Sequence, residues 1–288
     1  MTQNIYDNDG FFAGYSKLGR SVEGLDGAAE WPVLRALLPD LKGARVLDLG
    51  CGFGWFCRWA REAGTAQVSG LDVSEKMLER ARWDTKDPAI AYAREDLETL
   101  KLARDSFDLV YSSLTLHYIE NLRGLFEQIY RALVPGGSLV FSVEHPIYTA
   151  PRDPKWTADG TWPLDRYLEE GPRSTDWLAK GVIKQHRSVG TYLNMLLQTG
   201  FALTHVEEWG RPTSRSRPNP PSRPNASARP SCWWQRGARC ARAPAARPWR
   251  SSGRANGAAA GSDRAAVPAM AAATAGCRPV SARSCGSG

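Results

Sequence analysis

The feature that most constrains the fold is a short apolar segment that ends in an acid and three alternating glycines. Residues 45–54 read RVLDLGCGFG, and a helical pattern follows from Trp55 to about Ala63. Gly50 and Gly52 can adopt positive φ and let a ligand approach the main chain closely. The first N–H groups of the following helix lack partners within the helix and favour an anionic or polar ligand. The segment therefore predicts a strand, a glycine turn and a helix that bind a nucleotide-like ligand.

A second apolar segment, residues 66–71, ends at Asp72, which lies 18 residues beyond Gly54. A βαβ unit places the acid that accepts ribose hydroxyls roughly 20 residues after its glycines, so Asp72 is a candidate for that role. The alternative is an acid that caps the next helix. The glycines run G-x-G-x-G, and the third stands one residue early for the dinucleotide fingerprint.

Five ordered motifs resemble the class I S-adenosylmethionine (SAM) dependent methyltransferases, and in particular their methyltransferase type 11-like domain. The motifs are the glycine turn, GLDVS at 70–74, YAREDL at 92–97, FDLVYSS at 107–113 and LVPGGSLVF at 133–141. They cover roughly residues 40 to 145. The resemblance implies a Rossmann-like α/β fold, SAM as the cofactor and methyl transfer as the activity.

Alternating segments of strand and helix length support that fold. We expect strands at 45–49, 67–71, 89–93, 107–111 and 138–143, and helices at 26–38, 55–63, 74–81 and 120–133. A helix at 188–199 and a strand at 201–209 follow. Regular alternation of strands and helices predicts a doubly wound, mostly parallel sheet.

Composition divides the chain into five parts. We expect an N-terminal cap at 1–40, a SAM-binding core at 41–145, a substrate lid inserted after strand five at 146–187, the last helix and strand of the core at 188–210, and a tail at 211–288. The lid is rich in Pro, Trp and Tyr, and its aromatic rings either stack on a flat acceptor or pack the lid onto the body. The aromatic segment 6–20 either folds over the cofactor, as in similar enzymes, or simply packs.

The charge of the chain is unevenly distributed. Residues 211–288 hold 14 Arg and one Asp, a balance of +13, whereas residues 1–210 hold 23 basic and 29 acidic residues, a balance of −6; the sum is +7. An acidic body argues against a nucleic-acid substrate. With no apolar run of about 18 residues and no signal-peptide pattern, we expect a cytoplasmic protein, with no membrane contact, that is a monomer or homodimer.

The tail at 211–288 contains no Leu, Ile, Phe, Tyr, Lys, Glu or His. Such a segment cannot bury enough apolar surface to offset its ordering entropy, which predicts disorder. The resembled fold ends with an antiparallel strand, and the written sequence offers none. A frameshift near Gly210 is one hypothesis, because residues 231–235 read from the third base of each codon give an apolar run of strand length. A natural basic tail is the alternative.

The resemblance assigns cofactor-binding roles along the core. The glycines would let the main chain lie close to the methionine part of SAM, and Asp48 would lie near the amino end of that part. Asp72 would accept hydrogen bonds from the ribose hydroxyls, and Asp96 would accept one from the adenine amino group. Met77 and Leu97 would flank the ring, and Ser112 would close the side of strand four. The full candidate set is Asp48, Gly50, Cys51, Gly52, Gly54, Asp72, Val73, Met77, Asp96, Leu97 and Ser112. Cys51 is expected to be a small packing residue and not a nucleophile.

Three residues are candidates for proton transfer at the acceptor: His117 after strand four, and Glu144 and His145 at the end of strand five. The alternative for each histidine is a structural hydrogen bond. We expect methyl transfer to a small molecule by in-line displacement, without a metal. Two other functions stay open: a tRNA or protein acceptor, and a SAM-binding protein impaired by a C-terminal frameshift.

Overall fold

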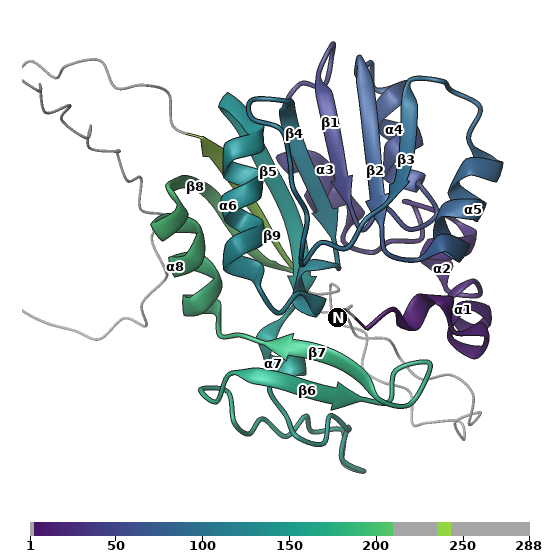
Figure 1. Cartoon of the computed structure of the whole chain (residues 1–288). Helices are drawn as coiled ribbons and strands as arrows, with labels where there is room; N and C mark the ends of the chain where they lie inside the picture. Colours follow the sequence, from purple (N-terminus) through teal and green to yellow (C-terminus); the bar gives the residue numbers. More distant parts are fainter. Residues whose placement is uncertain (1–2, 210–234, 243–288) are drawn as a thin grey trace, which may run out of the picture.

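A seven-stranded sheet forms the body of the protein in the computed structural model, which describes residues 3–209 and 235–242 (Figure 1). The strand order is β3-β2-β1-β4-β5-β9-β8. The strands are β1 (Arg45–Leu49), β2 (Gln67–Asp72), β3 (Ile90–Arg94), β4 (Phe107–Ser113), β5 (Leu133–Glu144), β8 (Phe201–Trp209) and β9 (Gln235–Arg242). β1 to β5 pair in parallel, which confirms the doubly wound, mostly parallel sheet.

Helices cover both faces of this sheet (Figure 1). They include α3 (Trp31–Leu37), α4 (Trp55–Glu62), α5 (Glu75–Asp84), α6 (Leu122–Ala132) and α8 (Val189–Thr199). α3 is shorter than expected and begins at Trp31, because Pro32 is tolerated only in the first turn of a helix. α5 begins after Ser74, whose hydroxyl accepts from the Met77 N–H.

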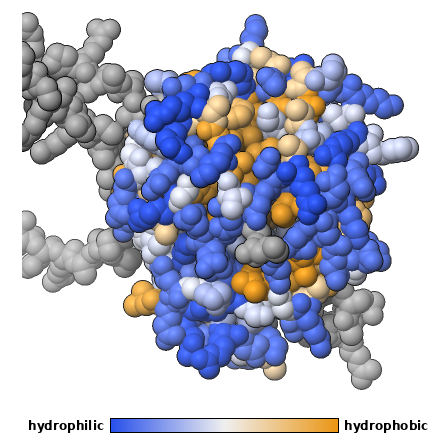
Figure 2. Space-filling model, viewed as in Figure 1, coloured by the Kyte–Doolittle hydropathy of each residue, from blue (hydrophilic) through white to orange (hydrophobic). Residues whose placement is uncertain are grey.

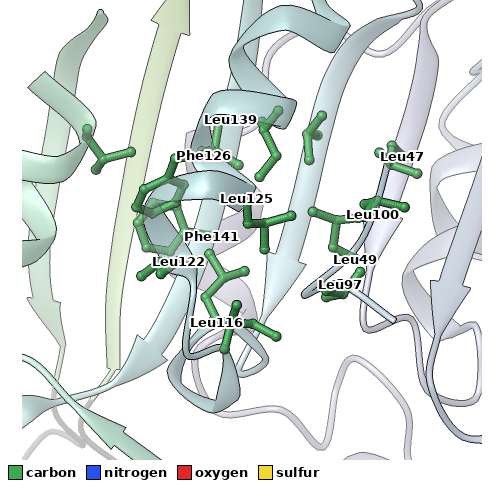
Figure 3. Packing of buried hydrophobic residues seen from close by; sticks show 14 of the residues in the cluster. Leu47, Leu49, Leu97, Leu100, Leu116, Leu122, Leu125, Phe126, Leu139 and Phe141 are labelled. Atoms are coloured by element: carbon green, nitrogen blue, oxygen red, sulfur yellow. The ribbon is translucent and has the colours of Figure 1, made fainter. Parts of the chain in front are cut away.

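Two apolar clusters lie on opposite faces of the sheet. Leu125 and Phe126 of α6 pack with Leu139 of β5 in one cluster (Figure 3). In the other cluster, Phe56 of α4 packs with Val140, the residue that follows Leu139 in β5. Adjacent residues of β5 serve different clusters because successive side chains of a strand point to opposite faces. From Gly137 to Val143, β5 is thus buried on both faces.

The strand β9 corrects one expectation. The written sequence was expected to lack a last antiparallel strand, but residues 235–242 pair antiparallel with both β5 and β8. The segment, QRGARCAR, has no β-branched or aromatic residue, so propensity gave no sign of it. Its place is set instead by the open hydrogen-bonding edges of β5 and β8. The remaining expectations for the tail, disorder and a frameshift near Gly210, concern residues outside the described ones.

Two further segments lie at the carboxyl ends of the parallel strands (Figure 1). One is the N-terminal cap, with the 3-10 helix η1 (Ile5–Asp7), α1 (Asp9–Tyr15) and α2 (Gly19–Val22). The other is the lid, with α7 (Pro146–Thr149) and the antiparallel hairpin β6 (Gly171–Thr175) and β7 (Val182–His186). In the space-filling view, hydrophilic residues surround smaller apolar patches (Figure 2). None of the described helices has the length and apolar character needed to span a bilayer.

Candidate cofactor and acceptor site

A cavity at the carboxyl ends of β1, β2 and β4 is the candidate site. It encloses about 1410 Å³ of empty space, its open mouth included. The turns after these strands, the N-terminal cap and the lid all contribute to its walls. This is the edge at which open α/β sheets bind their ligands.

The glycine turn after β1 forms one wall. Gly50 and Gly52 line the cavity with φ of 76° and 51°. A Cβ on Gly50 would lie 2.1 Å from Thr115 Oγ1, whereas a Cβ on Gly52 would meet nothing within 4 Å. Gly50 is thus required by both conformation and space, and Gly52 by conformation alone. Gly54 does not line the cavity; it precedes α4, and a Cβ there would lie 2.1 Å from the Tyr92 hydroxyl.

Asp72, at the end of β2, is held with its carboxylate oriented by the main chain. The Gly52 N–H donates to Oδ2 over 2.9 Å and the Ser74 N–H to Oδ1 over 2.9 Å. The side chain is buried but lines the cavity. Burial raises the pKa of Asp72 to about 6, against the lowering effect of these N–H groups. A fixed carboxylate at this position suits a vicinal diol, which offers two donors.

Four other predicted cofactor residues lie near Asp72 on the cavity wall. Val73 and Met77 come from the β2–α5 segment, and Asp96 and Leu97 from the turn after β3. The Asp96 carboxylate accepts from the Glu98 N–H over 3.0 Å, which fixes the turn. The structure therefore brings together an acid and three apolar side chains, a surface that fits a purine ring with an exocyclic amine.

Asp48 and Cys51 lie behind the glycine turn, along a smaller adjoining cavity that Gly50 and Gly52 also line. Asp48 is 2% exposed and accepts from the Cys57 thiol over 3.3 Å. Burial raises the pKa of Asp48 to about 7 and holds that of Cys51 well above its usual value. A thiol kept protonated is a poor nucleophile, so the packing role expected for Cys51 agrees with its surroundings.

Ser112 is buried and points away from the cavity. Its hydroxyl donates to the Leu49 carbonyl over 2.8 Å and so joins β4 to β1. The next residue, Ser113, lines the cavity instead. The alternation of side chains along β4 accounts for this shift of one position.

An ion pair that the sequence did not reveal lies on the cavity wall. Arg20 Nη2 lies 3.0 Å from Glu30 Oε1 and donates to Ser113 Oγ over 3.2 Å. Ser113 in turn donates to Glu30 over 3.2 Å. Arg20 is the last residue of the aromatic segment 6–20. No periodicity in the sequence connects it with Glu30, because the two residues lie in different elements of the cap.

The N-terminal cap is fastened to the edge of the cavity. Asp7 accepts from the Ser74 hydroxyl over 2.6 Å and from the Lys76 N–H over 3.2 Å. The Asn4 amide donates to the Val73 carbonyl over 3.3 Å. Burial and these hydrogen bonds act in opposite directions on Asp7, and its pKa is lowered overall. The aromatic segment therefore does more than pack: Tyr6 and Tyr15 line the cavity.

The cap also meets the lid. The Gln3 amide donates to the Gly181 carbonyl over 2.8 Å and accepts from the Ile183 N–H over 2.9 Å. The Trp177 ring lies 5.3 Å from the Phe11 ring in an edge-on arrangement. Of the lid aromatic residues, Trp177 lines the cavity. The cap and the lid thus contact one another through Gln3, Gly181 and Ile183 and through the Phe11 and Trp177 rings. This contact between cap and lid is called the seam.

His117, in the 3-10 helix η2 (Leu116–Tyr118), is the candidate proton-transfer residue that lines the cavity. Its Nδ1 accepts from the Glu144 N–H over 3.3 Å. Burial lowers the pKa of His117 well below its usual value, and the charges of Lys184, Arg187 and Arg20 lower it further. The ring is therefore neutral, and Nε2 carries its proton.

Glu144 and His145 do not line the cavity. Glu144 forms an ion pair with Lys184, with 2.6 Å between Oε2 and Nζ, and both side chains are nearly buried. His145 caps α7 by accepting from the Ile147 N–H over 3.1 Å, and its Nε2 lies 2.6 Å from Glu208 Oε1. The structure gives His145 the structural hydrogen bonds that were its alternative interpretation. A proton-transfer role for either residue stays a prediction.

Comparison with known proteins supplies the family. Residues 47–141 match the family described as a methyltransferase domain. A SAM-dependent methyltransferase from Mesorhizobium loti is 55% identical, with 76% of this chain and all of that chain covered and a TM-score of 0.67. An uncharacterized protein of Haemophilus influenzae is 36% identical over 217 residues, covering 71% of this chain and 85% of that protein.

A further relative is matched over a shorter stretch. A malonyl-[acyl-carrier protein] O-methyltransferase from Enterobacter lignolyticus is 41% identical over 109 residues, and the chain spans less than half of its length, 42%. The match covers 38% of this chain. Together with the sheet order and the cavity at the glycine turn, these likenesses establish that the chain belongs to the class I SAM-dependent methyltransferase family.

Proposed function

We propose that this protein transfers the methyl group of SAM to a small-molecule acceptor held under the cap and the lid. The single observation that carries the proposal is Asp72. Its carboxylate is fixed by the Gly52 and Ser74 N–H groups and lines the cavity at the carboxyl ends of the strands. A ribose diol supplies the two donors that this carboxylate lacks.

With the ribose at Asp72, the neighbouring residues are placed to bind the other parts of SAM. Met77 and Leu97 offer apolar surface to the adenine ring, and Asp96 an acceptor for its amino group. Gly50 and Gly52 let the methionine part pass close to the main chain. Arg20 and Glu30 offer a cation and an acid to its carboxylate and ammonium groups.

SAM supplies a methyl group on a positively charged sulfur, which leaves readily when a nucleophile approaches in line. The protein then has two tasks: to hold the acceptor in line with the methyl group, and to exclude water. The seam between Gln3 and the β7 hairpin covers the cavity, and Trp177 closes it from the lid side. The cap and the lid would thus hold the acceptor in line with the methyl group, as in-line displacement requires.

A small acceptor is favoured by the covered cavity and by the charge of the body. Residues 1–210 carry 23 basic and 29 acidic residues, which repels the phosphates of tRNA. One partial relative is named as a malonyl-[acyl-carrier protein] O-methyltransferase, which makes an oxygen acceptor a reasonable first test. A protein acceptor would need the seam between cap and lid to open widely.

Calorimetric titration with S-adenosylhomocysteine tests the cofactor assignment. We expect saturable binding that Asp72→Ala weakens at least tenfold, since both ribose hydrogen bonds are lost (about 1.4 kcal/mol per factor of ten). Asp26→Ala, an exposed acid of the cap, is the control and should bind normally. Failure of a folded, soluble sample to bind would refute the proposal. Transfer of labelled methyl to small acids, amines and phenols then tests the activity.

A further inference from the structure

The part of the cavity beyond the cofactor residues is walled by hydrogen-bond donors. Tyr6 and Tyr118 line it, with their hydroxyls 3.5 Å apart. Burial raises the pKa of both phenols, so both keep their protons at neutral pH. His117 lies beside Tyr118 and carries its proton on Nε2, because Nδ1 accepts from the main chain. The Tyr6 hydroxyl donates to Tyr118, so Tyr118 and His117 each have a proton to donate to a ligand.

The nearby carboxylates are already engaged. Glu144 pairs with Lys184 below the cavity, and Glu30 pairs with Arg20 and accepts from Ser113. Among the described residues, the acids that line the cavity are Glu30, Asp72 and Asp96, and the last two lie among the proposed cofactor residues. Glu30 is held by Arg20 and Ser113, and the Nδ1 lone pair of neutral His117 accepts from the Glu144 N–H, so neither is placed to take a proton from an acceptor.

The positive charges around this part of the cavity are not all compensated. Arg187 is 7% exposed, and its Nη2 donates to the carbonyls of Ile119 and Glu120 over 2.7 and 2.6 Å. Within the described part of the chain, Arg187 forms no ion pair and its Nη1 has no hydrogen-bond partner. Ile119 lines the cavity, so this guanidinium lies directly behind the wall. Lys184–Glu144 and Arg20–Glu30 are each neutral as pairs, and Asp72 and Asp96 lie among the proposed cofactor residues. Arg187 is therefore the unpaired charge on the side away from those residues.

We infer that the methyl acceptor is an organic acid and that the nucleophile is an oxygen of its carboxylate. The inference rests on the proposed function and narrows its substrate class. Donors from Tyr118 and His117, with the charge of Arg187 behind them, stabilise an anion and repel an ammonium group. Aromatic walls alone would also suit a cation, but the uncompensated Arg187 opposes it.

The reaction that follows needs no base. One carboxylate oxygen bonds to the methyl carbon while the carbon–sulfur bond breaks, and the electron pair of that bond stays on sulfur. The products are a methyl ester and S-adenosylhomocysteine. The negative acceptor and the positive sulfonium neutralise one another, and no proton is released. This agrees with a site in which Glu30 is paired with Arg20 and the other lining acids lie among the proposed cofactor residues.

Binding of matched fragments to the protein saturated with S-adenosylhomocysteine tests the inference. The probes are butanoate, butanamide and butylamine, and benzoate, benzamide and benzylamine, so that each tail carries three head groups. Dissociation constants come from NMR titration, with the His117 Nε2–H resonance as the local reporter. We expect each carboxylate to bind at least tenfold tighter than its amine, with the amide between. Arg187→Gln should reduce that ratio about fivefold, and Arg123→Gln, which alters an exposed arginine, should not.

The ranking in the unaltered protein decides the matter even if Arg187→Gln does not fold. Equal affinities, an amine that binds tighter, binding that leaves the His117 resonance unmoved, or no binding by either carboxylate would each overturn the inference. The S-adenosylhomocysteine titration of the same sample is read separately. Its failure would count against the proposed function, whereas the head-group ranking bears on the acceptor class alone.

Discussion

The thiol of Cys57 donates to the carboxylate of Asp48 over 3.3 Å, in an interior position behind the glycine turn. Asp48 is 2% exposed, and burial raises its pKa to about 7. Only one weak donor is present for this carboxylate in the hydrogen bonds of the described residues. An acid placed where its charge is poorly stabilised makes the stability of the fold depend on pH.

Asp48→Asn should change that dependence. Because the folded pKa lies above the unfolded value of about 4, the protonated acid favours folding, and this contribution is lost as pH rises from about 4 through 7. The asparagine variant should therefore gain stability over the parent across that window, by about 1–3 kcal/mol at pH 8. Chemical denaturation at pH 5 and pH 8 measures it, with exposed Asp26→Asn as the control. A difference that is the same at both pH values would contradict the prediction.

Gly50→Ala should abolish cofactor binding more completely than Gly52→Ala. Both residues have positive φ, which costs an alanine roughly 1–2 kcal/mol. Gly50 also faces Thr115, whose Oγ1 would lie 2.1 Å from the new Cβ, so the turn or the β4 end must move. Calorimetry with S-adenosylhomocysteine compares the variants. Gly50→Ala combined with Thr115→Gly should recover part of the affinity, and no recovery would show that the conformation alone matters.

The sequence predicted that several of the proposed cofactor residues lie together, because they stand at the ends of strands. Asp72 and Asp96 each follow an apolar segment, and parallel strands bring such positions to one edge of the sheet. The bounds of the five parallel strands and β8 were predicted within two residues, except that β5 begins at Leu133 and not at 138, because Leu133 pairs with Phe107 across an irregular register. The strands β6, β7 and β9 were not predicted.

The ion pairs and hydrogen bonds around the cavity could not be predicted in the same way. Lys184 and Glu144 are 40 residues apart, and Arg20 and Ser113 are 93 apart, so only tertiary packing brings them together. His145 follows β5 as a catalytic residue would, yet the chain turns into α7 and uses the ring as a cap. A side chain at a strand end has a predictable location, whereas its hydrogen bonds depend on distant segments.

Removal of residues 211–288 should destabilise the protein, because it removes β9. β9 pairs with β5 from Ser138 to Glu144 and with β8 from Phe201 to Trp209, so its loss leaves two unpaired strand edges in the middle of the sheet. Such edges promote aggregation. We expect the truncated chain to be largely insoluble, as measured by the soluble fraction and by light scattering.

A chain that ends after residue 242 separates the effect of β9 from that of the rest of the tail. It keeps every strand of the sheet and should remain soluble. The frameshift hypothesis makes a further prediction, since a chain with the restored frame should then be more stable than the written one. Equal stability of the two chains would refute that hypothesis, and full solubility of the 211–288 deletion would show that β9 is dispensable.

Gln3→Ala should speed cofactor release with little effect on stability. The Gln3 amide bridges the cap to the lid through Gly181 and Ile183, both of which are on the surface, so the two hydrogen bonds add little to folding. They do span the seam that any ligand must open. If the loss of these hydrogen bonds destabilises the closed state by about 1 kcal/mol, the dissociation rate of S-adenosylhomocysteine should rise about fivefold. Stopped-flow displacement monitored by intrinsic tryptophan fluorescence measures the rate, and thermal unfolding is the control. An unchanged rate would mean that ligands leave by a route that does not cross this seam.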